Sequence, residues 1–277
     1  MSDLFMREDA PLTSEEWAKL DGLVVEVARK TLAGRRFLHL FGPLGAGAQV
    51  VPVDRLGGVT AAAVGFEGEE AAEAVELAER EYIPLTTISK DFVLRWDDLA
   101  LARQHGGEVD FSPAAAAAFT VARAEDTLLF HGQAREPGLL KTKGRTTAPL
   151  GEWETTPGAA LEAVLAAWDK LAAAGFTGDF ALVLSNHLFS KLHRVNGGTG
   201  VLEIAQIREL VETIVPTPAL KPNQALLVAT GPENLDIAIG QDLVTAYLGP
   251  DGMDHVFRIF ESLALRVKRP GAICTFE

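Results

Sequence analysis

The feature of this sequence that most constrains its fold is an alanine-rich stretch from Ser112 to Gly132, SPAAAAAFTVARAEDTLLFHG. Alanine has the highest helix propensity, Ser112 is a suitable N-cap, and Pro113 fits the first helical turn. Gly132 can adopt the left-handed conformation that ends a helix. A helix of about twenty residues is about 30 Å long. It needs packing partners along most of that length, so we expect the rest of the chain to fold around it.

This predicted helix contains two acidic residues, Glu125 and Asp126. A helix that packs in a protein core normally keeps one polar stripe in contact with water. The sequence therefore predicts that both carboxylates belong to a solvated stripe, and it assigns them no chemical role.

The composition predicts a globular protein without a nucleic-acid or membrane partner. Apolar residues make up 48% of the 277 residues, which is enough to bury a core. The net charge of −13 repels phosphate backbones and anionic membrane surfaces. The single cysteine, Cys274, cannot form an internal disulfide and is expected to be a small buried side chain. With no leader or long apolar run in the sequence, the expected location is the cytoplasm.

Local signals also predict the elements before the long helix. Thr13 and Glu16 form a capping box, which starts a helix that runs to about Leu32 with one apolar face. A strand is predicted from Arg35 to Phe41, before a Gly-Pro turn. Residues 49–81 read as an arm, with a strand-like QVVPV and then an acidic run at 67–81. Periodicity leaves helix and hairpin both open for this run, and its carboxylates are interpreted as a solvated face.

The second half of the chain predicts an α/β module followed by strands. Its expected helices are 158–174, a short one capped by Asn186, and 201–212, with a flexible loop at 196–200. The expected strands are 180–184, 225–229, 235–239, 242–248, 255–268 and a last strand near residue 277.

The sequence contains no motif that is typical of a catalytic, metal or nucleotide-binding site. None of the six histidines pairs with another ligand at zinc spacing, and no nucleophile elbow or nucleotide fingerprint is present. An enzyme needs a nucleophile with an orienting base, and nothing here supplies one. The residues alone therefore predict a cytosolic α+β protein with arms, without a metal site.

Several short motifs nevertheless occur in an order that resembles encapsulin nanocompartment shell proteins. They are A-P-L-T-x-x-x-W at 10–17, G-R-R-F at 34–37, G-P-L-G-A-G at 42–47, K-D-F…W-D-D-L at 90–99, E-D-x-L-x-F-H-G at 125–132, G-Q-D-L-x-x-x-Y-L-G at 240–249 and P-x-A-I-C-T-F-E at 270–277. The resemblance covers essentially the whole chain and is closest to the group once known as linocin-type bacteriocins. It implies the fold of tailed-bacteriophage major capsid proteins, the Hong Kong 97 type.

The resemblance also implies a division of the chain. An N-terminal arm, helix and first strand (1–42), the spine-helix region (92–137) and the C-terminal strands (246–277) would build a peripheral domain. Residues 43–91 would form an extended loop, and 138–245 an axial domain around the five-fold axis.

The implied function is that of a shell protein. Copies of the chain would assemble into an icosahedral nanocompartment around cargo enzymes of the ferritin-like iron-storage or peroxidase type. The cargo would carry a terminal targeting peptide. The alternatives are a phage or prophage capsid protein and, third, an enzyme such as a protease.

The resemblance implies site residues as well. Those mapped to the cargo-peptide site are Val24, Val27, Ala28, Arg35, Phe37, His39 and Thr245. Those mapped to the five-fold pore are Asn196, Gly197, Gly198 and Thr199. Many relatives carry an aspartate where this chain has His39, so a basic peptide would lose a charge partner there. Trp96 matches a tryptophan that stacks flavin in some relatives, but a packing role is the other interpretation. No required cofactor is predicted.

Overall fold

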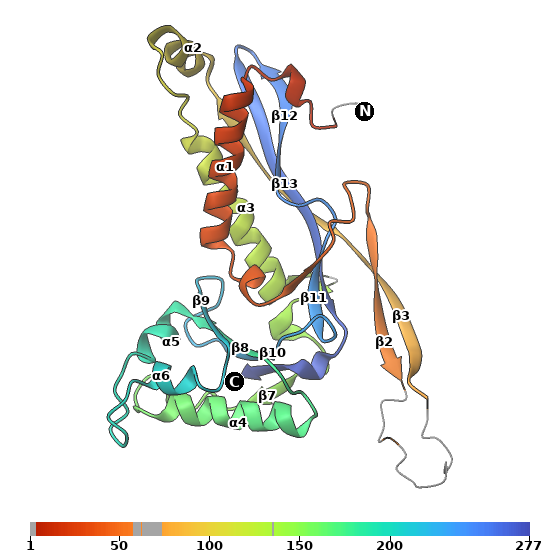
Figure 1. Ribbon diagram of the computed structural model, residues 1–277, viewed down its shortest axis with the longest axis vertical. Helices are drawn as coiled ribbons and strands as arrows, with labels where there is room; N and C mark the ends of the chain where they lie inside the picture. Colours follow the sequence, from red (N-terminus) through yellow and green to blue (C-terminus); the bar gives the residue numbers. More distant parts are fainter. Residues whose placement is uncertain (1–3, 58–61, 63–73, 135) are drawn as a thin grey trace.

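The computed structural model describes residues 4–57, 62, 74–134 and 136–277. Figure 1 shows an elongated molecule in which two long helices, α1 (Ser14–Thr31) and α3 (Ser112–His131), lie beside a sheet of long strands. A smaller module with shorter helices forms the other end, and a hairpin projects from the side. The remaining helices are α2 (Trp96–His105), α4 (Ala159–Ala173), α5 (Asn186–Lys191) and α6 (Glu203–Ile207).

Helix α1 begins at the predicted capping box. The Glu16 backbone N–H donates to the Thr13 hydroxyl at 3.2 Å, and the Thr13 N–H donates to the Glu16 carboxylate at 2.7 Å. The buried face of α1 contains Trp17, Leu20, Val24 and Ala28, and most of it packs in a shared core with α3. This burial fixes the orientation of α1 and leaves Val25 and Arg29 of the helix exposed.

Helix α3 confirms the predicted spine. Its N-cap is Phe111 rather than Ser112, because the Asp110 carboxylate accepts the Ser112 N–H at 2.9 Å and its hydroxyl at 2.6 Å. Gly132 ends the helix with a φ of 71°, and an added Cβ there would lie 2.2 Å from the Glu136 carbonyl oxygen. Glycine is therefore required at this close approach.

The sheet beside α1 and α3 is organised around one long strand, β13 (Asp254–Val267). It pairs antiparallel with three other strands, and a fourth, β1, adds parallel to β11. Those four are β1 (His39–Phe41), β4 (Thr86–Leu94), β11 (Leu235–Ile239) and β12 (Val244–Asp251). The strand predicted over Arg35–Phe41 is thus shorter than expected. Residues 34–36 form a 3-10 turn, η2, because the Asp126 carboxylate binds the backbone N–H groups of Ala33 and Gly34.

The second sheet carries α4, α5 and α6 and has its own apolar core. Its strand order is β7 (Thr146–Ala148), β14 (Ile273–Phe276), β10 (Ala225–Ala229), β8 (Phe180–Ser185) and β9 (Thr213–Thr217). The sequence missed β9, whose Pro216 argues against a strand but is tolerated at this sheet edge. Ser185, not Asn186, caps α5 by accepting the Leu188 N–H at 3.2 Å. Within the helix predicted over 201–212, the structure has only the shorter helix α6 (Glu203–Ile207).

The sheets do not follow the predicted domain ranges at two points. Strand β11 lies within 138–245 but pairs with β13, and β14 lies within 246–277 but pairs with β10 and β7. Each sheet therefore takes strands from both ranges. The ranges themselves stay predictions.

The predicted arm contains an antiparallel hairpin of β2 (Val50–Gly57) and β3 (Glu76–Pro84). Glu76, Glu79 and Glu81 lie in a strand, which answers the helix-or-hairpin question for them, whereas 67 to 73 lie outside the described residues. Arg80 pairs with Asp54 at 2.6 Å, so basic partners offset part of the acidic charge. A second, minor hairpin joins β5 (Gly132–Gln133) and β6 (Glu136–Pro137).

Candidate functional site

A groove runs between α1 and the segment that enters β12. Its main part is a cavity of about 460 Å³ lined by apolar side chains of α1, by Leu243 and by Arg29, Arg35, Arg36 and Asp242. A second cavity of about 180 Å³ continues it and shares Val25 and Leu243 with the first. Apolar walls with a few polar groups suit a small extended ligand, because the walls supply burial and the polar groups fix orientation.

The structure brings four of the predicted cargo-site residues to this groove. Ala28 and Arg35 line the main cavity, and Val24 and Thr245 line its continuation. Thr245 is 1% exposed, and its hydroxyl has no hydrogen-bond partner within the described part of the chain. Buried hydroxyl groups normally have a hydrogen-bond partner, and an ordered water or a ligand atom would supply one here.

The other three predicted residues lie elsewhere. Val27 is partly buried against the α1–α3 core. The ring of Phe37 is buried and stacks on Phe130 with centroids 6.3 Å apart. His39 is exposed, and with Phe37 it lines a neighbouring cavity of about 310 Å³ that shares Arg35 with the groove. Phe37 thus contributes mainly to the core, and His39 lies beside the groove.

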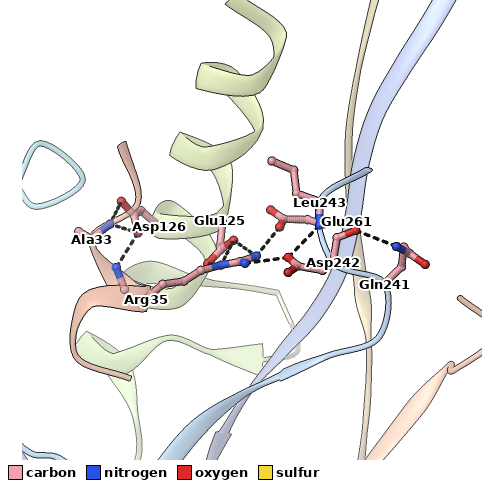
Figure 2. A network of polar contacts seen from close by, with 9 residues as sticks. Ala33, Arg35, Glu125, Asp126, Gln241, Asp242, Leu243 and Glu261 are labelled. Atoms are coloured by element: carbon pink, nitrogen blue, oxygen red, sulfur yellow. Dashed lines mark hydrogen bonds and ion pairs between the residues drawn. The ribbon is translucent and has the colours of Figure 1, made fainter. Parts of the chain in front are cut away.

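Figure 2 shows that Arg35 is held by three carboxylates from different parts of the chain. Its Nε and Nη2 donate to Glu125 of α3 at 2.8 to 3.1 Å. Nη2 also donates to Glu261 of β13 at 2.7 Å, and Nη1 donates to Asp242 at 2.7 Å. Burial by itself lowers the pKa of Arg35, but the hydrogen bond to Glu125 and the neighbouring carboxylates outweigh burial and raise it. Arg35 is therefore a charged strut that ties η2 to α3, β13 and the start of β12.

Asp126 fixes the turn that presents Arg35. Its carboxylate accepts the N–H group of Ala33 at 2.9 Å (Figure 2) and that of Gly34 at 2.9 Å. Burial raises the pKa of Asp126 to about 6, although these two hydrogen bonds act in the opposite direction. The expectation that Glu125 and Asp126 form a solvated stripe is therefore wrong, because both are buried at the junction of α1, η2 and α3.

The predicted pore residues form an ordered loop at the tip of the second module. Thr199 and Gly200 donate backbone N–H groups to the Asn196 carbonyl, and Gly198 donates to the Asn196 side chain at 3.1 Å. The Asn196 amide in turn donates to Gln206 of α6 at 3.3 Å. The expected flexible loop is thus held by hydrogen bonds from its own side chains.

The buried position of Glu203 was not predicted from the sequence. Glu203 is buried at the start of α6, and its carboxylate lies near the backbone N–H groups at the N-terminus of α4. Burial raises the pKa of Glu203, and the N–H groups of Gly158, Leu161 and Ala160 oppose the shift. The available signal was the absence of a capping side chain at Gly158, which leaves the first amides of α4 without local acceptors.

Trp96, the proposed flavin-stacking residue, is the first residue of α2 and is 45% exposed. Its backbone N–H donates to Asp254 at 3.0 Å. The partly exposed ring leaves room for a stacking partner, and both flavin binding and the absence of a required cofactor stay predictions. Within the described ranges, no group of three metal-ligating side chains occurs and no helix is long and apolar enough to cross a membrane.

Comparisons with known proteins agree with the fold. The structure of a virus-like particle from Pyrococcus furiosus matches with a TM-score of 0.77 at 24% identity, covering 95% of this chain and 100% of that chain. The capsid of Myoviridae phage XM1 matches with a TM-score of 0.67 at 14% identity, covering 88% and 91%. These likenesses show the fold, and they confirm the predicted phage-capsid type.

The sequence comparisons go further. A family model described as the encapsulating protein for peroxidase matches residues 1–264. The type 1 encapsulin shell protein EncA of Myxococcus xanthus is 45% identical over 280 residues, covering 100% of this chain and 97% of the relative. Such relatives are structural shell proteins, which confirms the prediction of a structural protein rather than an enzyme. The capsid fold, the whole-length family match and this identity together place the chain in the encapsulin family of shell proteins.

Proposed function

We propose that copies of this chain assemble in the cytoplasm into an icosahedral shell, which encloses a cargo enzyme held by a terminal peptide in the α1 groove. The observation that carries the proposal is the relationship to a type 1 encapsulin shell protein over the whole chain. A cargo of the peroxidase type is consistent with the family description, which names a peroxidase as the enclosed protein, and one relative is a ferritin-like fusion with the shell protein, which is consistent with the ferritin-like type.

The β2–β3 hairpin supports assembly. Its inner residues Val51 and Val53 are buried against the sheet, while Val50, Leu56 and Tyr82 are between 54% and 62% exposed. An exposed apolar face on a projecting hairpin is unfavourable in an isolated subunit. A second copy of the chain would cover this face and pair with the free strand edges.

The groove supports cargo binding. It offers apolar α1 side chains, a buried Thr245 hydroxyl and the exposed Arg29 and Arg36 within one continuous hollow. An extended peptide fits such a surface because it can bury alternate side chains while its backbone meets the polar groups. In the same proposal the 196–199 loop surrounds the five-fold pore and controls which solutes reach the cargo.

The net charge of −13 supports a protein cargo over a nucleic-acid one, since it opposes phosphate packing. The test is to purify the particles from native cells and identify their contents by mass spectrometry. We expect one co-purifying enzyme whose loading is lost when its terminal peptide is removed. Particles filled with nucleic acid would contradict the proposal and favour the phage-capsid alternative.

A further inference from the structure

The Arg35 cluster places more negative than positive groups in a buried site. The side chains of Glu125 and Glu261 are 0% and 1% exposed, and that of Arg35 is 15% exposed. Asp242 is 55% exposed and keeps much of its hydration. The buried charges are therefore one guanidinium and two carboxyl groups. An unneutralised buried carboxylate is strongly unfavourable.

The contacts indicate which carboxyl oxygen would carry a proton that removes this excess negative charge. Oε2 of Glu261 accepts Nη2 of Arg35 at 2.7 Å, whereas Oε1 of Glu261 is buried without a hydrogen-bond donor among the described residues. Both oxygens of Glu125 face Arg35. A proton on Glu261 Oε1 can be donated to the Glu125 carboxylate, which gives the unpartnered oxygen a partner and leaves one negative charge opposite one positive charge.

The groups that face Glu261 come from each neighbouring element. They are Arg35 of η2, Glu125 of α3 and Asp242 before β12, and on the adjacent strand β4 its pair is the uncharged Ile88. Asp126, next to Glu125, is bound to backbone N–H groups. Burial, followed by repulsion from Glu125, raises the pKa of Glu261 to about 9, which agrees with the geometry.

This cluster forms one side of the groove, because Arg35 and Asp242 line the main cavity opposite α1. We propose that Glu125 and Glu261 are positioning residues of the groove that share one proton and thereby hold Arg35 in place, so that loss of this proton at alkaline pH opens the groove. An open groove should retain a cargo peptide more weakly at alkaline pH, and this consequence rests on the proposed function. The opening of the groove does not depend on the proposed function.

Loss of the proton should open the groove because it changes the buried charges from a neutral set to a set with one excess negative charge. With the proton present, Arg35 and Glu125 neutralise each other and Glu261 is a neutral donor. Without it, two carboxylates repel each other across one guanidinium in a medium of low dielectric constant. In this proposal water reaches Glu261 by displacement of Arg35 and Asp242, because both line the main cavity and Asp242 is 55% exposed.

A fluorescent label can report this opening without any cargo. Val25 lines both cavities and is 41% exposed, so a Val25→Cys variant can carry a solvent-sensitive dye in the groove. The natural Cys274 is fully buried, which makes labelling selective for position 25. Dye emission is recorded on the purified full chain from about pH 7 to about pH 10, the range in which the proton would be lost.

We expect an emission change with a midpoint near pH 9 in the labelled parent. Glu261→Gln should abolish the transition, because glutamine stays neutral and its amide can both accept from Arg35 and donate to Glu125. Glu203→Gln, which alters another buried carboxyl far from the groove, should leave the midpoint unchanged.

Two results would overturn the proposal: a parent with no alkaline transition, or a Glu261→Gln variant with the same transition as the parent. If Glu261→Gln does not fold, Glu125→Gln serves as the second variant. It leaves a single carboxylate opposite Arg35, so the buried charge cannot become unbalanced and the alkaline transition should be lost; a transition with the parent midpoint contradicts the shared proton. Failure of cargo to co-purify would count against the proposed function and leave this titration unaffected.

Discussion

A buried ion pair between Arg266 and Asp236 lies where the β2–β3 hairpin joins the sheet. Its removal should affect both the stability and the assembly of the subunit. Arg266 of β13 binds the Asp236 carboxylate with two hydrogen bonds of 2.6 and 2.7 Å. Its Nη1 also donates to the Pro52 carbonyl of β2 at 3.2 Å, and its guanidinium stacks on the ring of Phe41 at 3.9 Å. Arg266 thus connects β13 to β11, β2 and β1 at the point where the hairpin leaves the body.

The expected magnitude for Arg266→Met follows from these contacts. Removing one partner of a buried ion pair costs about 3–5 kcal/mol, because the other charge is left without compensation. Lys268, 2.9 Å from Asp236, remains and reduces this loss, whereas the lost bond to Pro52 adds about 1 kcal/mol. We expect the free energy of unfolding of the subunit to fall by about 3 kcal/mol, measured by urea denaturation.

The double variant Arg266→Met with Asp236→Leu separates two causes. Replacing both charges with apolar side chains is often neutral or stabilising, so most of the lost stability should return. The bond to Pro52 stays absent, so the hairpin remains loose and assembly, judged by electron microscopy, stays impaired. If the double variant is as unstable as Arg266→Met alone, the loss does not come from an unpaired Asp236, and the reasoning is refuted.

Three further predictions concern the groove, the pore loop and the buried acids. Val25→Trp should fill the groove and prevent cargo loading while particles still form, because Val25 lines both cavities and is 41% exposed; full loading by gel densitometry would move the cargo site elsewhere. Gly197→Asp should change the rate at which charged substrates reach enclosed cargo, because an added Cβ there meets nothing within 4 Å and only the loop charge changes; unchanged kinetics would argue against a pore position. Glu261→Gln should stabilise the subunit increasingly with pH. The native pKa of Glu261 lies above the unfolded one, so its contribution is fully present below about pH 4.5 and is lost as pH rises through about 9. A stability difference that is constant with pH would contradict the raised pKa.

Much of the local structure could be predicted from the sequence because its signals are local. The Thr13–Glu16 capping box, the Pro113 start and the Gly132 end each depend on residues a few positions apart, and all three are present. The continuous apolar run 180–184 likewise forms a strand buried on both faces. Such elements carry their own start and stop signals.

The buried acid cluster could not be predicted in this way. Arg35 meets Glu125 across 90 positions and Glu261 across 226 positions of the chain, and nothing in the local pattern around Glu125 indicates a buried partner. The same cluster explains the shorter β1, since Asp126 holds the preceding residues in a turn. The helical pattern alone therefore led to the wrong prediction that the side chains of Glu125 and Asp126 are exposed to solvent.

The residues of the cargo-peptide site come from the family resemblance, and their role stays a prediction. Ala28 and Thr245 line one groove in the structure, because α1 and β12 lie side by side there. The resemblance could not foresee that Phe37 points into the core, since this depends on the 3-10 turn at 34–36. A Phe37→Asp variant would therefore disturb the core and would not by itself test cargo binding.

The central claim, that the chain is a shell subunit, is tested most directly by sedimentation velocity of the purified full-length protein. Particles many times heavier than the 29.6 kDa subunit, uniform in size and closed by electron microscopy, are the predicted result. A variant that lacks residues 57–81 should sediment as folded but unassembled subunits. A full-length protein that sediments only as a monomer or small oligomer under all assembly conditions would contradict the account.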